Sequence, residues 1–166
     1  CYPWTVPMLN GRTICLRNID IKKIFELIEK YDVTHFGGAP IVLNMITGAP
    51  ASDQKKLKNK VYVLTAGAPP PSIIFKKMKA LGFEVMHVYG LTETYGHVTQ
   101  CAWNDEWNSF DEEKQNEIKA RQGVRYPNTE GVVVLDPKTM KEVPKDGKTI
   151  GEIMIRGNVV MKGYFC

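Results

Sequence analysis

Apolar runs, loops of small residues and helical segments alternate three times in the first 94 residues. The runs 33–36, 61–64 and 83–88 have the length and the β-branched or aromatic side chains of short buried strands. A loop rich in Gly, Pro or Thr follows each run, and the first two loops lead into helical segments at 41–46 and 72–81. This order predicts an α/β fold in which helices cover a parallel sheet.

Capping residues mark the ends of the predicted helices. Apolar residues recur at spacings of three and four between residues 20 and 31, which predicts one buried helical face behind an Asp20 N-cap. Ser72 is expected to cap the helix 72–81, and Gly82 to end it. His87 lies within the third run and is expected to be a buried, hydrogen-bonded histidine.

The pattern changes after residue 94. A polar helix is predicted over 109–122, and the runs 132–135 and 150–156 predict a small antiparallel β region. We therefore divide the chain into an α/β portion (1–103), a connecting helix and loop (104–130) and the start of a β subdomain (131–166).

Composition and charge exclude several classes of protein. The 43% of hydrophobic residues is typical of a globular chain, and the net charge of +4 is dispersed, so we expect no nucleic-acid partner. We expect no transmembrane segment, since no apolar stretch approaches roughly 20 residues. The four cysteines and three histidines have no zinc-site spacing, and scattered thiols favour a reducing compartment. Cys1 in place of Met, and an end at Cys166 directly after an apolar run, lead us to expect an internal fragment.

Two loops contain residues suited to nucleotide chemistry. In the segment 89–94, Gly90 permits close approach of a ligand, the Thr92 hydroxyl can donate to a phosphate oxygen, and the Glu93 carboxylate can hold Mg²⁺. The residues alone favour a plain turn in which Thr92 caps the following segment. In the segment 65–71, small residues leave room for a flat ring, but the residues by themselves favour a simple connecting loop.

Taken in order, these segments resemble a known family. Thr65-Ala66-Gly67-Ala68-Pro69, then Tyr89-Gly90-Leu91-Thr92-Glu93-Thr94, then Gly151-Glu152-Ile153-Met154-Ile155-Arg156-Gly157 are similar to motifs of the adenylate-forming, AMP-binding superfamily. The segments 101–103, 120–126 and 157–164 resemble the plant-type acyl-activating enzymes, and the likeness covers essentially the whole chain. A nucleotide-dependent oxidoreductase is a weaker alternative, because the chain lacks the G-x-G-x-x-G fingerprint.

The resemblance implies a role for each motif residue. Thr92 and Glu93 would be catalytic, Thr92 at the α-phosphate and Glu93 on Mg²⁺. The nucleotide would be bound by Thr92 together with Gly67, Ala68, Pro69, Tyr89, Gly90 and Leu91. The acid pocket would be walled by His35, Phe36, Gly37, Gly38, Tyr95, Gly96 and His97.

The resemblance also implies an activity and its cosubstrates. The parent would be an acyl-CoA ligase that uses ATP and Mg²⁺ to activate a medium-chain fatty or small aromatic acid as acyl-AMP, then transfers the acyl group to coenzyme A. Its compartment would be the peroxisome or the cytoplasm. The family's phosphate loop and upstream histidine would precede residue 1, and its ribose-binding aspartate and catalytic lysine would follow residue 166. We therefore expect these 166 residues alone to be inactive. The alternative is a truncated AMP-binding module that only binds nucleotide or partners.

Overall fold

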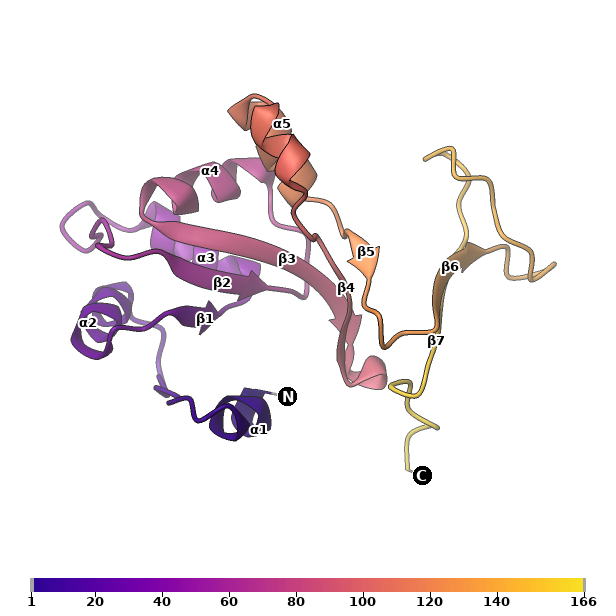
Figure 1. Cartoon of the computed structure of the whole chain (residues 1–166), viewed down its shortest axis with the longest axis horizontal. Coiled ribbons are helices and arrows are strands. Elements are labelled where there is room, and N and C mark those ends of the chain that lie inside the picture. Colours follow the sequence, from indigo (N-terminus) through magenta and orange to yellow (C-terminus); the bar gives the residue numbers. More distant parts are fainter. Residues whose placement is uncertain (1, 166) are drawn as a thin grey trace.

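A computed structural model describes residues 2–165, and its main feature is a five-stranded sheet (Figure 1). The strands lie in the order β1-β2-β3-β4-β5. The first three strands are parallel, and β4 and β5 continue the sheet antiparallel. Their bounds are β1 His35–Gly37, β2 Val61–Thr65, β3 Phe83–Leu91, β4 Gly96–Gln100 and β5 Val124–Arg125. The predicted α/β class is confirmed, with an antiparallel extension added to the parallel part.

Helices α2 (Ile21–Tyr31), α3 (Pro40–Gly48) and α4 (Ser72–Ala80) cover one face of this sheet. Helix α5 (Glu112–Lys119) packs against α4 and β3, and the short helix α1 (Tyr2–Met8) lies apart from the sheet (Figure 1). Side chains from α2, α3 and α4 form the hydrophobic core with alternate residues of β2 and β3, including the fully buried Phe25, Leu43, Met78 and Val63. Asp20 caps α2 as expected, since its carboxylate accepts a hydrogen bond of 3.0 Å from the Lys23 amide.

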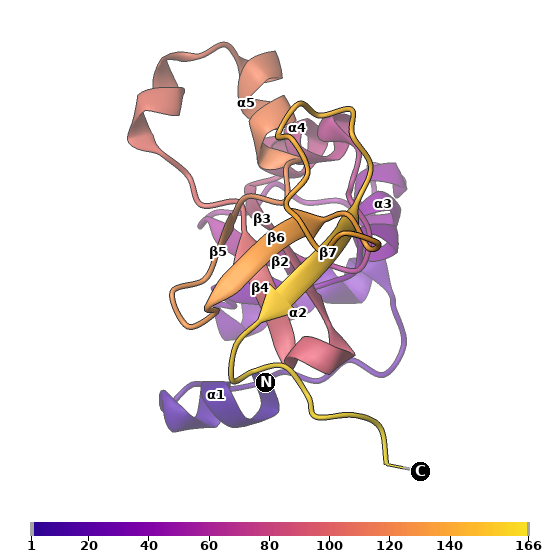
Figure 2. The same cartoon turned by 90° about the vertical axis from the view of Figure 1, so that its right-hand side faces the viewer.

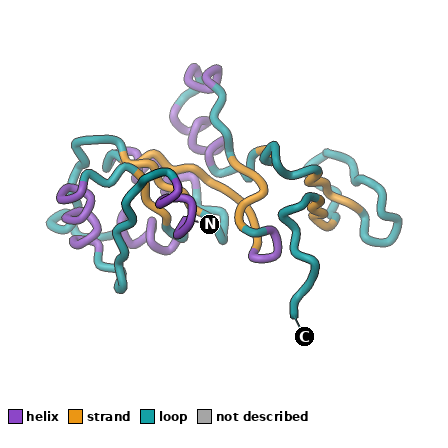
Figure 3. Tube along the Cα trace, turned by 60° about the horizontal axis from the view of Figure 1, so that its bottom comes forward, coloured by secondary structure: helices purple, strands orange, loops and turns teal. Residues whose placement is uncertain are grey.

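A second, two-stranded sheet follows the first. The strands β6 (Gly131–Leu135) and β7 (Glu152–Arg156) pair antiparallel, which confirms the predicted small β region. Figure 2 shows this pair in front of the larger sheet. The tube in Figure 3 shows that long loops flank the strands of this smaller sheet near the C-terminal end.

Several predicted strand boundaries were wrong, including the start of β7, which lies at Glu152 rather than at 150. β1 lies at His35–Gly37 rather than at 33–36, so Gly37 belongs to a strand and not to the following loop. β3 runs on past Val88 to Leu91, because β4 folds back and supplies hydrogen-bonding partners for its last residues. Pairing with a later segment extended the strand, and the local pattern contained no signal for it.

The helix predictions needed three corrections. Pro71, not Ser72, is the N-cap of α4, and Ser72 is the first helical residue. The polar helix is shorter than 109–122, because a 3-10 helix occupies Asp105–Ser109 and Asp111 then caps α5 through the Lys114 amide. Helix α1 was not predicted. No helix within residues 2–165 combines the length and apolar character that crossing a bilayer requires.

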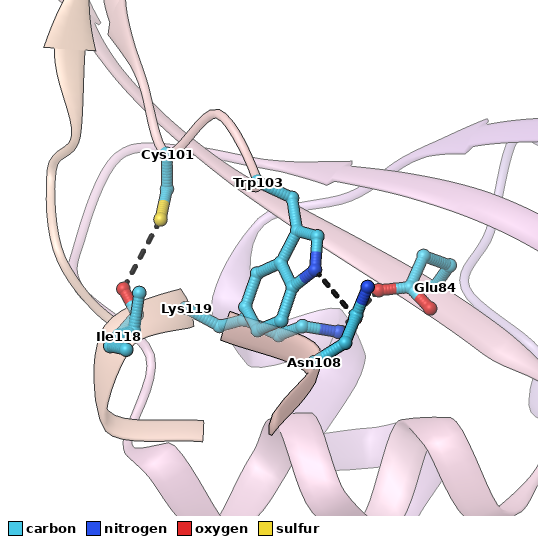
Figure 4. A network of polar contacts seen from close by, with 6 residues as sticks. All are labelled: Glu84, Cys101, Trp103, Asn108, Ile118 and Lys119. Carbon is cyan, nitrogen blue, oxygen red and sulfur yellow. Dashed lines mark hydrogen bonds and ion pairs between the residues drawn. The ribbon is translucent and has the colours of Figure 1, made fainter. Parts of the chain in front are cut away.

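The segment 104–130 packs against the edge of β3. Lys119 on α5 forms an ion pair with Glu84 of β3, and its ammonium group lies 5.0 Å from the centre of the Trp103 ring (Figure 4). His87 is 2% exposed, and its Nδ1 lies 3.1 Å from the Ala120 carbonyl oxygen, so the predicted buried histidine is confirmed. These contacts, with β5 pairing onto β4, join the segment to the α/β portion. The division at residues 103 and 130 stays a prediction.

The structure describes two cysteines, Cys15 and Cys101, and both are free thiols. Cys101 donates a hydrogen bond of 3.1 Å to the Ile118 carbonyl (Figure 4), and burial raises the pKa of its thiol. A thiol with a raised pKa is a poor nucleophile at neutral pH. Cys15 is an exposed free thiol. The predictions made on Cys1 and Cys166 lie outside the described residues.

Candidate functional site

The carboxyl ends of the three parallel strands meet at one edge of the sheet. Gly37 lies opposite Leu64, and Thr65 lies opposite His87. The Gly38 amide donates to the Leu64 carbonyl over 3.1 Å, which ties the loop after β1 to the end of β2. The loop after β1 thus lies beside the end of β2, and the loop after β2 starts beside β3. Ligands of open α/β sheets bind at this edge.

The segment 89–94 forms the tip of a hairpin beyond this edge. After Leu91 the chain turns through a 3-10 helix, η1 (Thr92–Thr94), and returns as β4. Tyr95 completes the turn in the left-handed region with a φ of 55°. Thr92 is exposed, and Glu93 is partly exposed. The hairpin therefore presents both predicted catalytic residues on a tight, hydrogen-bonded turn.

Thr94 holds this turn together. Its hydroxyl is buried, with 4% of the residue exposed, and accepts from the Leu91 amide over 2.9 Å. The same oxygen lies 3.0 Å from the Leu91 carbonyl and 2.8 Å from the Gly96 carbonyl, either of which can accept its proton. One side chain thus joins the start, the end and the exit of the turn.

Replacing Thr94 with Val keeps the shape and removes the hydroxyl. The Leu91 amide would lose its hydrogen-bond partner, so we expect the full-length protein to lose about 0.5–1.5 kcal/mol of unfolding free energy. Urea denaturation measures this loss. Thr13→Val, at an exposed position, is the matched control. Equal stability of the two variants would show that the hydroxyl does not hold the turn.

Glu93 receives two hydrogen bonds from the end of the described chain. The Tyr164 hydroxyl donates to Glu93 Oε1, and this bond, followed by the contribution of its own backbone, lowers the pKa of the Glu93 carboxyl. The Met161 amide donates to the Glu93 carbonyl over 2.8 Å. The carboxylate is therefore ionised at neutral pH and oriented by a neutral group.

The residues present fit a magnesium ion that is shared with a nucleotide. Mg²⁺ prefers hard oxygen ligands, and proteins commonly hold it through one or two carboxylates together with substrate phosphates. Residues 2–165 contain no cluster of three or more His, Cys, Asp or Glu side chains suited to a metal. A single ionised carboxylate next to an exposed Thr hydroxyl suits an ion that brings its other ligands with the phosphates.

The loop after β2 leaves space beside its main chain. Gly67 has a φ of +97°, which favours glycine, and no heavy atom of the described residues lies within 4 Å of where its Cβ would be. Gly67, Ala68 and Pro69 follow the end of β2, where Thr65 is fully buried. The open position suits the approach of a flat ring, and the assignment of the loop to adenine stays a prediction.

The predicted acid-pocket residues of β1 point to two sides of the sheet. His35 is exposed and stacks on Tyr62, with 5.4 Å between ring centres. Phe36 packs against the hydrophobic core on the opposite face, because alternate strand residues face opposite ways. Gly37 ends β1, and Gly38 begins the loop that follows it. The acid-pocket role of these four residues stays a prediction.

The remaining pocket residues lie on the hairpin exit. Tyr95 is 71% exposed, and Gly96 begins β4. The His97 ring lies 5.2 Å from the ring of Tyr126, and burial lowers the pKa of His97. Tyr126 in turn donates to the Gln100 side chain. The sequence predicts no individual role for Tyr126 or Tyr164, which lie in the family-like segments 120–126 and 157–164.

Comparison with known proteins identifies the family. A family model described as "AMP-binding enzyme" matches residues 1–165. The chain belongs to the AMP-binding enzyme family. This AMP-binding chain is 53% identical over 166 residues to a peroxisomal acetate/butyrate–CoA ligase of Arabidopsis thaliana, and 53% identical to an acetate–CoA ligase of Humulus lupulus. The predicted likeness to plant acyl-activating enzymes is confirmed.

Two solved structures share the fold of this chain. The N-terminal domain of FACL13 from Mycobacterium tuberculosis superimposes with a TM-score of 0.70 at 25% identity, over 95% of this chain and 36% of that one. The o-succinylbenzoate coenzyme A synthetase of Bacillus subtilis in complex with AMP gives 0.73 at 18% identity, over 95% of this chain and 29% of that one. The match covers 99% of this chain but 29% of the length of either plant ligase.

Proposed function

We propose that this chain is part of the nucleotide-binding domain of an ATP-dependent acid–CoA ligase. The observation that carries the proposal is the Thr92-Glu93 turn at the carboxyl end of β3, in a chain matched along its length by the AMP-binding family. Thr92 would donate to the α-phosphate, and Glu93 would hold Mg²⁺. The loop at Gly67 and Ala68 and the backbone at Tyr89 would flank the adenine.

The reaction has two steps. An acid carboxylate attacks the α-phosphorus of ATP, the bond to the bridging oxygen breaks, and pyrophosphate leaves with acyl-AMP formed. The coenzyme A thiol then gives up its proton and attacks the acyl carbon, and AMP leaves. Bound Mg²⁺ would supply positive charge to the phosphates during the first step. The protein residues orient the groups and stabilise developing charge, so no protein nucleophile is needed.

The acid is proposed from the relatives' names. Relatives of this chain are named for acetate, butyrate and 2-methylpropanoate, which favours a small aliphatic acid. Medium-chain fatty acids and small aromatic acids were the expectation from the sequence. Pyrophosphate release by the full-length protein, measured across acids of two to ten carbons and benzoate-type acids, separates these classes. No release with any acid would contradict the ligase proposal. A protein that binds ATP without turnover would favour the non-catalytic module.

The compartment is proposed on similar grounds. Two plant relatives carry the word peroxisomal in their names, so we propose the peroxisome, with the cytoplasm as the second compartment. Imaging of the tagged full-length protein beside a peroxisomal marker tests this assignment.

The 166 residues by themselves are expected to lack ligase activity. The chain spans 29% of the length of either plant ligase, and the resemblance assigns the phosphate loop and the catalytic lysine to segments outside it. Acid-dependent exchange of pyrophosphate into ATP, measured with the purified chain, checks this expectation. Exchange above the no-protein background would contradict it, and the full-length protein serves as the positive control.

A further inference from the structure

Two contacts reach Glu93 from a segment about seventy residues later in the chain. After β7 the chain turns at 157–160 and passes beside η1, where Met161 bonds the Glu93 backbone and Tyr164 bonds its side chain. Figures 1 and 2 both show this segment next to the short helix at the end of β3. The segment that follows β7 thus contacts Glu93, the candidate metal ligand, through Met161 and Tyr164.

Hydrogen bonds from two directions hold the backbone at Glu93 in place. The Thr94 hydroxyl and the bond of 3.2 Å from the Tyr95 amide to the Thr92 carbonyl hold the turn from the β4 side. The Met161 amide holds the Glu93 carbonyl from the other side. With the backbone held on both sides, the remaining freedom lies in the Glu93 side chain, and Tyr164 restricts that freedom.

The chemistry of the Tyr164 contact suits a metal ligand. A carboxylate has two oxygens with about four acceptor positions, so a bond to Oε1 leaves Oε2 available for a cation. A Lys or Arg partner would compete for the negative charge, whereas a neutral hydroxyl orients the carboxylate and leaves its charge in place. Within residues 2–165, none of the ion pairs involves Glu93.

We propose that Tyr164 is a positioning residue for Glu93, whose hydroxyl holds Oε1 and thereby aims Oε2 at the divalent cation of the bound nucleotide. This proposal rests on the proposed function, in which Glu93 binds that cation. It gives the β subdomain a direct part in building the nucleotide site. Partners that orient metal ligands in this way typically change metal affinity by about 10- to 100-fold.

The test uses Tyr164→Phe in the full-length protein. Mn²⁺ binding in the presence of ATP, without acid, is measured by water-proton relaxation, and the Mg²⁺ concentration for half-maximal pyrophosphate release is measured separately. Because Tyr164 is 67% exposed, we expect the low end of the range, a loss of about tenfold in Mn²⁺ affinity. The Mg²⁺ requirement should rise in parallel, and saturating Mg²⁺ should restore most of the rate.

Two further variants make the outcome decisive. Tyr31→Phe removes the same hydroxyl at the far end of α2 and should change neither measurement. In a Glu93→Gln background, Tyr164→Phe should add little, because the two residues act through one contact. An equal effect of Tyr164→Phe in both backgrounds would overturn the proposal, since Tyr164 would then act independently of Glu93.

The failures of the two proposals can be told apart. If Glu93→Gln weakens Mn²⁺ binding and Tyr164→Phe does not, the positioning role is wrong and the metal assignment stands. If Glu93→Gln itself leaves Mn²⁺ binding unchanged, the metal role of Glu93 is wrong, and the role of Tyr164 is wrong with it. Thermal melting of each variant separates a loss of fold from a loss of the metal site.

Discussion

Replacing Glu93 with Gln in the full-length protein is expected to slow adenylation by about 10²–10³-fold. The amide keeps the shape of the side chain and removes the charge that would hold Mg²⁺ beside the α-phosphate. The cation would then be held less firmly where negative charge grows during attack. Apparent affinity for the acid should change little, because the acid pocket is assigned to other residues. Raised Mg²⁺ should restore part of the activity.

Steady-state pyrophosphate release, measured against acid, ATP and Mg²⁺ in turn, tests each part of this expectation. Glu26→Gln is a matched control, since Glu26 is an exposed carboxylate on α2. A Glu93→Gln rate within about threefold of wild type, and no change in the Mg²⁺ requirement, would remove the metal assignment. Glu93 would then be a residue of the turn that only anchors the segment carrying Tyr164.

Gly90→Ala is expected to displace the hairpin that carries Thr92 and Glu93. A Cβ on residue 90 would lie 2.0 Å from the Gly96 carbonyl oxygen and 2.4 Å from the His97 Cα, well inside contact distance. The β3–β4 register shifts between Tyr89 and Gly90. Because the Cβ would meet backbone atoms of β4, the two strands must move apart to admit it, and this movement displaces the tip. We expect about 1–3 kcal/mol of lost stability. A displacement of about 1 Å at the reacting groups would lower adenylation by roughly 10²-fold.

Gly48→Ala provides the matched control for this variant. Gly48 ends α3, and no heavy atom lies within 4 Å of the position of its Cβ. The control should therefore keep the wild-type rate and lose no stability, since Ala is at least as favourable as Gly in a helix. Urea denaturation and pyrophosphate release measure the two effects separately. If Gly90→Ala melted and turned over like Gly48→Ala, the close approach of β3 and β4 would not govern the position of the turn.

Local sequence patterns determined the elements that depend on their own residues. The spacing of Ile24, Phe25 and Ile28 places apolar side chains on one face of a 3.6-residue helix, and Asp20 satisfies an amide at its start, so both were predictable. The alternation of runs and loops likewise predicted the parallel strands β1–β3. Because parallel strands end at one edge, it also predicted where the motif loops would lie.

Tertiary structure decided the contacts between distant segments. The extension of β3 to Leu91 needed β4 to pair with it, and the short α5 needed a cap at Asp111 that competed with a longer polar pattern. The sequence contained the motif residues Glu93 and Tyr164, but nothing in their spacing indicates that they touch. That contact depends on how β6 and β7 return the chain toward η1. Local patterns carry the period of a helix or strand and the identity of chemical groups. Which groups meet is set by the packing of the whole chain.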